Sequence, residues 1–379
     1  MENYILLENQ KKYCGQMIAS SVILSLIFFL VLFPSHNSYA RVTGPCSNCH
    51  TMHNSQEGDS VEGFMAFEDD GTANRTLLAT TCVGCHTGEN TADSTTPYVM
   101  GLSKPDFGKD GNTLAGGNFW WVAQGGSIND KKGHNVAGIT ISDNNLNSAP
   151  GQTEGFSRSC RLCHSSLEDG CKNCHRIPKH HANDGTGTKL VNTAEQGWYR
   201  FLSGHMGGIG RGVEGIEHEK WNYKADEKSH NEYLGKKQHG EYGFDGGGNT
   251  TTAFCTGCHG QFIHQQSDAG QWIRHPSDAV ICDPDNPDSE NSEYATAFGG
   301  VYDPDVPVAR PSLDGWTTSS NIVTPGEDMV MCLSCHVAHG SPYPDMLRWD
   351  YDLMIAGTTN PAVQGTGCFK CHTEKDGED

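Results

Sequence analysis

A five-residue word, Cys-x-x-Cys-His, occurs seven times in this chain and constrains its fold more than any other feature. With 16 Cys and 19 His among 379 residues, composition alone predicts far fewer than one occurrence. The thiol pairs are Cys46 and Cys49, Cys82 and Cys85, Cys160 and Cys163, Cys171 and Cys174, Cys255 and Cys258, Cys332 and Cys335, and Cys368 and Cys371. The histidines that follow them are His50, His86, His164, His175, His259, His336 and His372.

Two thiols three positions apart, followed by an imidazole, are typical of c-type haem attachment. The thiols can form thioethers with the two vinyl groups of one porphyrin, and the histidine can bind the iron as its proximal ligand. Structural zinc needs complementary pairs of Cys and His rather than one His fixed to each Cys pair. A disulfide framework has no use for the trailing histidine. We therefore predict seven covalently bound haem c groups.

Residues 1–40 have the pattern of a secretory signal peptide. Lys11 and Lys12 precede an apolar run over 17–33, and the segment ends in Ser-Tyr-Ala, a small-x-small cleavage signal. A retained membrane anchor is the alternative, because the apolar run is nearly long enough to span a bilayer. We expect a secreted protein without a transmembrane segment after cleavage, at the outer cell surface or outside the cell. The periplasm is the alternative location.

The rest of the chain provides only about 48 residues per motif, too few for a conventional core around each cofactor. Only 35% of the residues are hydrophobic, and 46 Gly and 16 Pro would favour disorder in a chain without cofactors. Porphyrins would supply the missing apolar surface and staple the chain together. The predicted fold is a multihaem cytochrome c, loop-rich and elongated, with short helices and little sheet, packed around a stack of seven haems.

The spacing of the motifs divides the chain after residue 40 into four segments. At each end a motif with a second histidine (CSNCHTMH, CLSCHVAH) precedes another motif, 36 residues apart from His to His. The segment with two motifs eleven residues apart should hold the most tightly coupled haems, near the middle of the stack. The predicted segments are an N-terminal two-haem module (41–100), a central segment with the close haem pair (101–190), a single-haem segment with distal histidines (191–325) and a C-terminal two-haem module (326–379).

Histidines outside the motifs suffice to bind the distal face of every iron, because eleven remain after residue 40 for seven irons. His53 and His339 each follow a proximal histidine by three positions and should reach a neighbouring haem rather than their own. His180 and His181 point apart in an ordinary backbone, so one of them, with His181 favoured, should coordinate. His218 and His239 lie among charged residues and are predicted to be solvated. The candidate distal ligands are His53, His134, His180, His181, His205, His230, His275 and His339.

Iron with two imidazole ligands exchanges electrons but has no open position for a substrate. We therefore predict an electron-transfer protein without catalytic residues. Multihaem nitrite reductases typically carry Lys in place of the motif histidine, and no Cys-x-x-Cys-Lys occurs here. The alternatives are a reductase with one open haem and, less favoured because histidine is in surplus, methionine as an axial ligand.

Four further features carry predictions of their own. A net charge of −20 argues against nucleic acid as a partner. Cys282, the one cysteine after residue 40 outside a motif, is expected to be an inert thiol, with an intermolecular disulfide as the alternative. Carboxylates in the loop DPDNPDSE have calcium-like spacing, although such loops are usually solvated turns; they are Asp283, Asp285, Asp288 and Glu290. The aromatic run Phe119, Trp120 and Trp121 is expected to pack on a haem.

Several motif flanks resemble the outer-surface multihaem cytochromes of metal-respiring bacteria, in particular the hexahaem cytochromes that form conducting filaments (nanowires). They are CHTMHNS, KGHNVAG after GGNFWWV, an Arg-His-Pro after the fifth motif, CLSCHVAH and the closing Cys-x-Lys-Cys-His. The resemblance implies bis-His irons throughout, and a residue at the position of His53 that reaches a haem of the next subunit. It also implies self-assembly, with other multihaem cytochromes or extracellular acceptors as partners. A seventh motif, in the stretch 160–181, departs from that family. A discrete periplasmic or surface electron shuttle is the alternative function.

Overall fold

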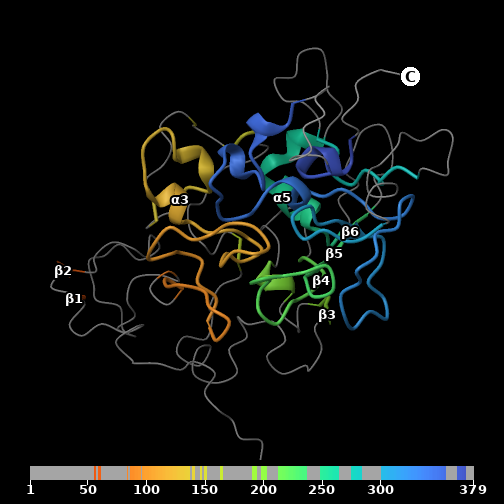
Figure 1. The fold of residues 1–379 in the computed structure, drawn as a ribbon, viewed down its shortest axis with the longest axis horizontal. Helices are drawn as coiled ribbons and strands as arrows, with labels where there is room; N and C mark the ends of the chain where they lie inside the picture. Colours follow the sequence, from red (N-terminus) through yellow and green to blue (C-terminus); the bar gives the residue numbers. More distant parts are fainter. Residues whose placement is uncertain are drawn as a thin grey trace, which may run out of the picture. The chain divides into compact units, whose positions relative to one another are not determined.

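Turns and loops make up most of the described chain, and its helices are short (Figure 1). The longest helix is α5 (Thr251–His259), followed by the 3-10 turn η6 (Gly260–Ile263). The helices α3 (Trp120–Ala123) and α7 (Cys332–Cys335) are single turns. The other 3-10 turns are η2 (Asp130–Lys132), η5 (Tyr199–Phe201), η7 (Pro344–Met346), η8 (Tyr351–Leu353) and η9 (Gly367–Lys370). The predicted loop-rich fold with short helices is confirmed.

The computed structural model describes residues 83, 86–94, 96–136, 139–140, 146, 149–151, 163–164, 190–193, 198–202, 212–236, 248–263, 275–283, 300–355 and 365–372, and the backbone of 55–56 and 59–60. The chain divides into the units Met1–Arg41 and Val42–Asp379, and every described residue belongs to the second. The predicted signal peptide lies outside the described residues. So do Cys46, Cys49, His50, His53, Cys82, Cys85, Cys160, Cys171, Cys174, His175, His180, His181 and His205.

The described strands form one small sheet and one hairpin. The sheet has the order β3 (Leu190–Val191), β4 (Gly215–Ile216), β5 (Glu232–Leu234), β6 (Ala309–Arg310). Its first three strands are antiparallel, and β6 runs parallel to β5 with Tyr233 opposite Ala309. The hairpin joins β1 (Ser55–Gln56) to β2 (Asp59–Ser60). The strands are two or three residues long, so side-chain packing rather than sheet extent must stabilise this region.

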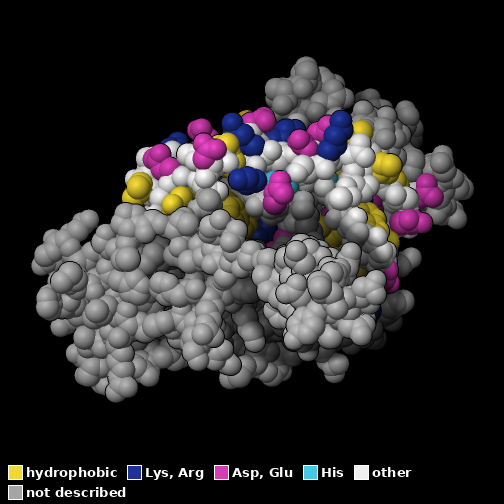
Figure 2. Space-filling view, turned by 90° about the horizontal axis from the view of Figure 1, so that it is seen from below, with side chains coloured by type: hydrophobic (Ala, Val, Ile, Leu, Met, Phe, Trp, Pro, Cys, Tyr) yellow, Lys and Arg dark blue, Asp and Glu magenta, His cyan; other side chains and the backbone are white. Residues whose placement is uncertain are grey.

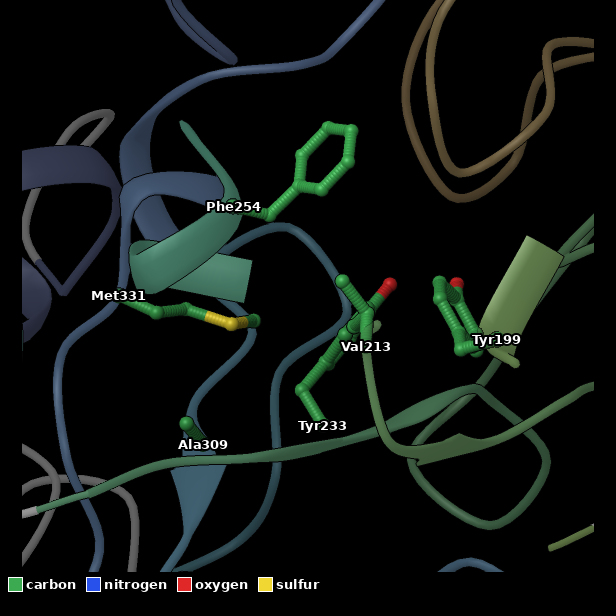
Figure 3. Packing of buried hydrophobic residues seen from close by; sticks show 6 residues of the cluster. All are labelled: Tyr199, Val213, Tyr233, Phe254, Ala309 and Met331. Atoms are coloured by element: carbon green, nitrogen blue, oxygen red, sulfur yellow. The ribbon is translucent and has the colours of Figure 1, made fainter. Parts of the chain in front are cut away.

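An apolar cluster joins the sheet to two attachment motifs (Figure 3). Phe254 comes from α5 and Met331 directly precedes α7, so the cluster fixes both helices relative to β5 and β6. Full burial of each large side chain is worth about 1.5–3 kcal/mol. The motif residue Cys255 packs against the same cluster. Its buried members are Tyr199, Val213, Tyr233, Phe254, Ala309 and Met331.

A buried ion-pair network fastens the segment after β6 to the sheet. Arg310 is 2% exposed and donates from Nε to Glu232 Oε2 at 2.8 Å and from Nη1 to Asp328 Oδ2 at 2.6 Å. Its remaining donors reach the carbonyl groups of Ser320 and Ile322. Because the fork of donors is fully used, the desolvation cost of the buried charge is offset by hydrogen bonds.

Hydrogen bonds between distant segments place two of the candidate ligands. The His134 amide donates to the His339 carbonyl at 3.2 Å, and the His339 amide donates to the Gly116 carbonyl at 2.7 Å. Gly117 has a φ of +80°, and a Cβ there would clash with the carbonyl oxygen of Gly340. Only glycine fits this close approach. The predicted central segment and C-terminal module are therefore in direct contact, and their boundaries stay a prediction.

Candidate haem-binding sites

Helical spacing brings the two thiols of a motif to one face. In α5, Cys255 and Cys258 are three positions apart, so their side chains lie one turn apart on the same side. The Thr250 hydroxyl caps this helix by accepting from the Ala253 amide at 3.0 Å. In α7, the Ser334 hydroxyl accepts from the Met331 amide at 3.0 Å and stabilises a single turn that would be marginal alone. The helix-forming motif therefore presents both thiols together.

Besides His230, which is described below, five candidate iron ligands each form a hydrogen bond from ring Nδ1 to a backbone carbonyl. Carbonyl oxygen only accepts, so Nδ1 carries the hydrogen and Nε2 keeps the lone pair that a metal requires. Such bonds also fix the orientation of metal-binding imidazoles. The pairs are His86 with Pro97 (2.7 Å), His134 with Ala338 (2.6 Å), His164 with Arg200 (2.6 Å), His259 with Pro150 (2.7 Å) and His336 with Asp345 (2.7 Å).

Three histidine pairs have the ring separation that one shared iron requires. Metal–nitrogen bonds of about 2 Å, with each ring nitrogen about 1 Å from its centroid, place two axial imidazoles about 6 Å apart. Each pair joins a motif histidine to a candidate distal histidine. The centroid separations are 6.2 Å for His134 and His259, 6.3 Å for His164 and His339, and 6.3 Å for His275 and His336.

Burial favours the neutral form, which binds metal, in His134, His164, His259, His336 and His339. Burial lowers the pKa of His164, His259 and His336. His134 is an exposed residue, yet desolvation by the surrounding protein lowers its pKa as well. Burial, with His164 and His134 as neighbours, lowers the pKa of His339 to about 3.

Burial raises the pKa of several described motif thiols, whereas a hydrogen bond with Cys255 lowers the pKa of Cys332. Burial, with Cys368 and Cys371 nearby, raises the pKa of Cys335 to about 12. Burial also raises the pKa of Cys371 to about 11, against a smaller opposing effect of Lys370. Zinc binds thiolates, which such sites disfavour, whereas thioether formation consumes the thiol. The residues present therefore fit covalent haem better than structural zinc.

Successive motifs lie close enough to influence one another electrostatically. Cys258 contributes to the raised pKa of Cys163, and Cys255 forms a hydrogen bond with Cys332 that raises the pKa of Cys255. The third, fifth and sixth motifs are thus neighbours in that order. Cys368 and Cys371 influence Cys335, which adds the seventh motif after the sixth. His86 influences His164, which places the second motif next to the third.

Aromatic rings and backbone groups complete the sites, and sequence reasoning missed most of them. Phe262 stacks on His259 with centroids 5.9 Å apart and contacts His275 at 4.5 Å. The position of Phe262 three residues after His259 was the sequence signal that could have predicted this contact. Phe119 stacks on His339 at 4.7 Å, whereas the predicted packing of Phe119 on a haem stays a prediction. The carbonyl groups that orient the imidazoles carry no side-chain signal, so sequence alone could not reveal them.

Two histidines lie in positions that differ from their predicted roles. His230 is fully buried, with Nδ1 3.1 Å from the Asp226 carbonyl and Nε2 3.0 Å from Glu232 Oε1. With both ring nitrogens occupied, His230 does not fit the predicted role of a distal ligand. His218 is buried rather than solvated, because its ring accepts from two backbone amides inside a turn. Flanking residue types did not reveal either hydrogen-bond set.

The remaining candidates have less structural detail. Cys282 is a half-buried free thiol that contributes to the raised pKa of Cys371. Of the four carboxylates with calcium-like spacing, only Asp283 is described. Within the described ranges, no three His, Cys, Asp or Glu side chains are grouped so that they could hold a metal ion. In the same part of the chain, no helix has the length and apolar character needed to cross a membrane.

Comparisons with known proteins find one family model and two solved structures that are similar to this chain. The family described as "Doubled CXXCH motif" matches residues 324–377, which contain the sixth and seventh motifs. Two solved structures from Geobacter sulfurreducens are similar, each at 18% identity. The Outer Membrane Cytochrome S filament has a TM-score of 0.46, covering 87% of this chain and 92% of that chain. The OmcS nanowires have a TM-score of 0.41, covering 88% and 93%. No curated protein matches this chain.

Proposed function

We propose that this chain is a heptahaem c-type cytochrome that conducts electrons outside the cytoplasm along a series of bis-His irons. The observation that carries the proposal is the set of three histidine pairs at 6.2–6.3 Å. A haem with two imidazole ligands exchanges single electrons and offers no position to a substrate. The proposal therefore assigns the protein to electron transfer rather than to catalysis.

The chain's own residues have three tasks in this function. The motif histidines His164, His259 and His336 hold the proximal side, and the carbonyl bonds at Nδ1 orient their rings. The distal side falls to His339, His134 and His275 respectively. The neighbour relations among the motifs define a path that runs from the second to the third, fifth, sixth and seventh motif.

The finer proposal is that the protein assembles into extracellular filaments. It is supported by the likeness of the motif flanks to filament-forming hexahaem cytochromes, which implies that His53 reaches an iron of the next subunit. The described part of one face carries acidic and basic side chains side by side (Figure 2). Side chains of opposite charge that alternate on one face weaken the repulsion between like subunits that the net charge of −20 would otherwise cause.

The test uses the secreted holoprotein. Intact mass should show seven haems, and the reduced, undenatured protein should take up no carbon monoxide, because every iron has two protein ligands. Uptake of one equivalent would overturn the all-bis-His claim in favour of a reductase with an open haem. Electron microscopy should show filaments for the native chain and dispersed particles for His53→Ala with seven haems. Intact filaments from that variant would exclude the inter-subunit role of His53.

A further inference from the structure

Asp278 is a buried carboxylate in an unfavourable position beside the sixth attachment motif. It is 9% exposed, and its Oδ1 has no hydrogen-bond partner among the described residues. Its φ is +63°, the left-handed conformation that non-glycine residues adopt at a cost. Strain together with an unsatisfied buried polar atom marks a residue whose presence stability does not explain.

The surroundings of Asp278 connect it to two motifs. The neighbouring residue, Ser277, lies with its hydroxyl 3.5 Å from Cys332 Sγ, and the Asp278 carboxylate acts electrostatically on the same thiol. The Cys332 thiol in turn forms a hydrogen bond with the thiol of Cys255, in the fifth motif. The amide of Asp278 donates to the Val330 carbonyl at 2.7 Å, which fixes the turn against the segment that enters α7.

Burial raises the pKa of Asp278 to about 6, and the nearby Thr252 offsets part of this effect. The Thr252 hydroxyl makes no hydrogen bond of regular geometry, and it lowers the pKa of the carboxylate through a weak hydrogen bond. Among the described residues, the titratable group that interacts with Asp278 is the thiol of Cys332 on α7, and this thiol is hydrogen-bonded to that of Cys255 on α5. Thioether formation would remove both from titration. His275 precedes Asp278 by three residues, and its ring lies opposite His336.

We propose that Asp278 is a proton-binding site coupled to the electron at the sixth motif. This inference rests on the proposed function, which supplies the electron from a one-electron donor or a neighbouring site. When one electron enters, the added negative charge disfavours the buried carboxylate, which binds one proton from solvent and becomes a carboxylic acid. When the electron leaves, the O–H bond breaks and the proton returns to solvent. Charge near Cys332 therefore stays nearly constant in a low-dielectric interior, where an uncompensated charge is costly.

The experiment measures the protons bound per chain on full reduction of the holoprotein, in weakly buffered solution with a pH indicator. Asp278→Asn removes the titration but preserves shape, and asparagine tolerates the left-handed conformation. We expect this variant to bind up to one proton fewer per chain than the native protein, with the largest difference just above pH 6. In the native protein, the electron affinity at this site should change by up to tenfold per pH unit, about 59 mV for a one-electron couple.

Glu214→Gln is the matched control, because burial and Asp314 raise the pKa of Glu214 as well, while Asn192 is its other neighbour. This control should leave the proton count unchanged. Equal proton binding by Asp278→Asn and the native protein, both with seven haems, would overturn the inference and leave the proposed function intact. Fewer than seven haems in the native protein would instead contradict the proposed function.

A second measurement applies if Asp278→Asn does not mature. Infrared difference spectra of the native protein should show, on reduction, a carbonyl band of a protonated carboxyl group that shifts in heavy water. Absence of such a band between pH 5 and 8 would overturn the inference without any variant.

Discussion

Two histidines, His230 and His339, lie in regions that are stabilised in different ways. Around His230 the buried polar groups pair with one another, since both ring nitrogens have partners and Arg310 pairs with two buried carboxylates. The ring of His339 instead lies opposite that of His164, with the two centroids 6.3 Å apart. The first region has the hydrogen bonds of an ordinary protein interior, whereas the second is the proposed site of a bound haem. Burial alone therefore does not distinguish a core histidine from an iron ligand; the partners of Nε2 do.

The largest expected effect concerns the region around His230, where buried polar groups pair with one another. Arg310→Ala leaves Glu232 and Asp328 buried without their cation, which should lower the free energy of unfolding by about 3–5 kcal/mol. Denaturant unfolding of the holoprotein measures this, and the number of haems should stay seven. Lys109→Ala is the control, because Lys109 is 44% exposed and pairs with Asp303 at 3.9 Å. That exposed pair is worth less than about 1 kcal/mol. Equal losses in both variants would contradict the distinction between the regions.

A second change tests the haem-binding region. His134→Ala removes the proposed distal ligand of the iron held by His259, so the reduced variant should bind one carbon monoxide per chain while keeping seven haems. Optical titration with carbon monoxide measures the uptake. His218→Ala is the control, since His218 is another histidine outside the motifs, but its ring forms hydrogen bonds with Ser229 and backbone amides. Uptake by the control, or none by His134→Ala, would show that ring separation is a poor guide to coordination.

The smallest expected effect is the pH dependence of the stability that the region around His230 contributes. Burial alone would raise the pKa of Glu232, but hydrogen bonds from His230 and Arg310 outweigh it and lower the pKa. A lowered pKa in the folded state means that Glu232 stabilises the fold above its ordinary value of about 4.3, and that this contribution disappears as the pH falls through the lowered value. The free energy of unfolding of the native protein should therefore fall more on acidification than that of Glu232→Gln, as measured by denaturant unfolding at several pH values. Parallel curves for the two proteins would contradict this.

Sequence reasoning succeeded where local chemistry sets the outcome. The motifs identified the attachment thiols and proximal histidines as candidates, and composition predicted the loop-rich fold with short helices. It was less successful for residues whose role depends on distant partners. The sequence made His134 and His230 equal candidates for distal ligands. Only His134 lies opposite a motif histidine, while Glu232 forms a hydrogen bond with Nε2 of His230.

The sequence by itself determined that the chain carries seven c-type haem-attachment motifs, because their chemistry lies within five consecutive residues. Tertiary structure alone decided which histidine faces which. His134 meets His259, and His164 meets His339, across more than a hundred residues of sequence. The physical reason is that an axial pair depends on backbone contacts between remote loops, such as that of Gly117 with Gly340, and no local pattern encodes both sides of such a contact.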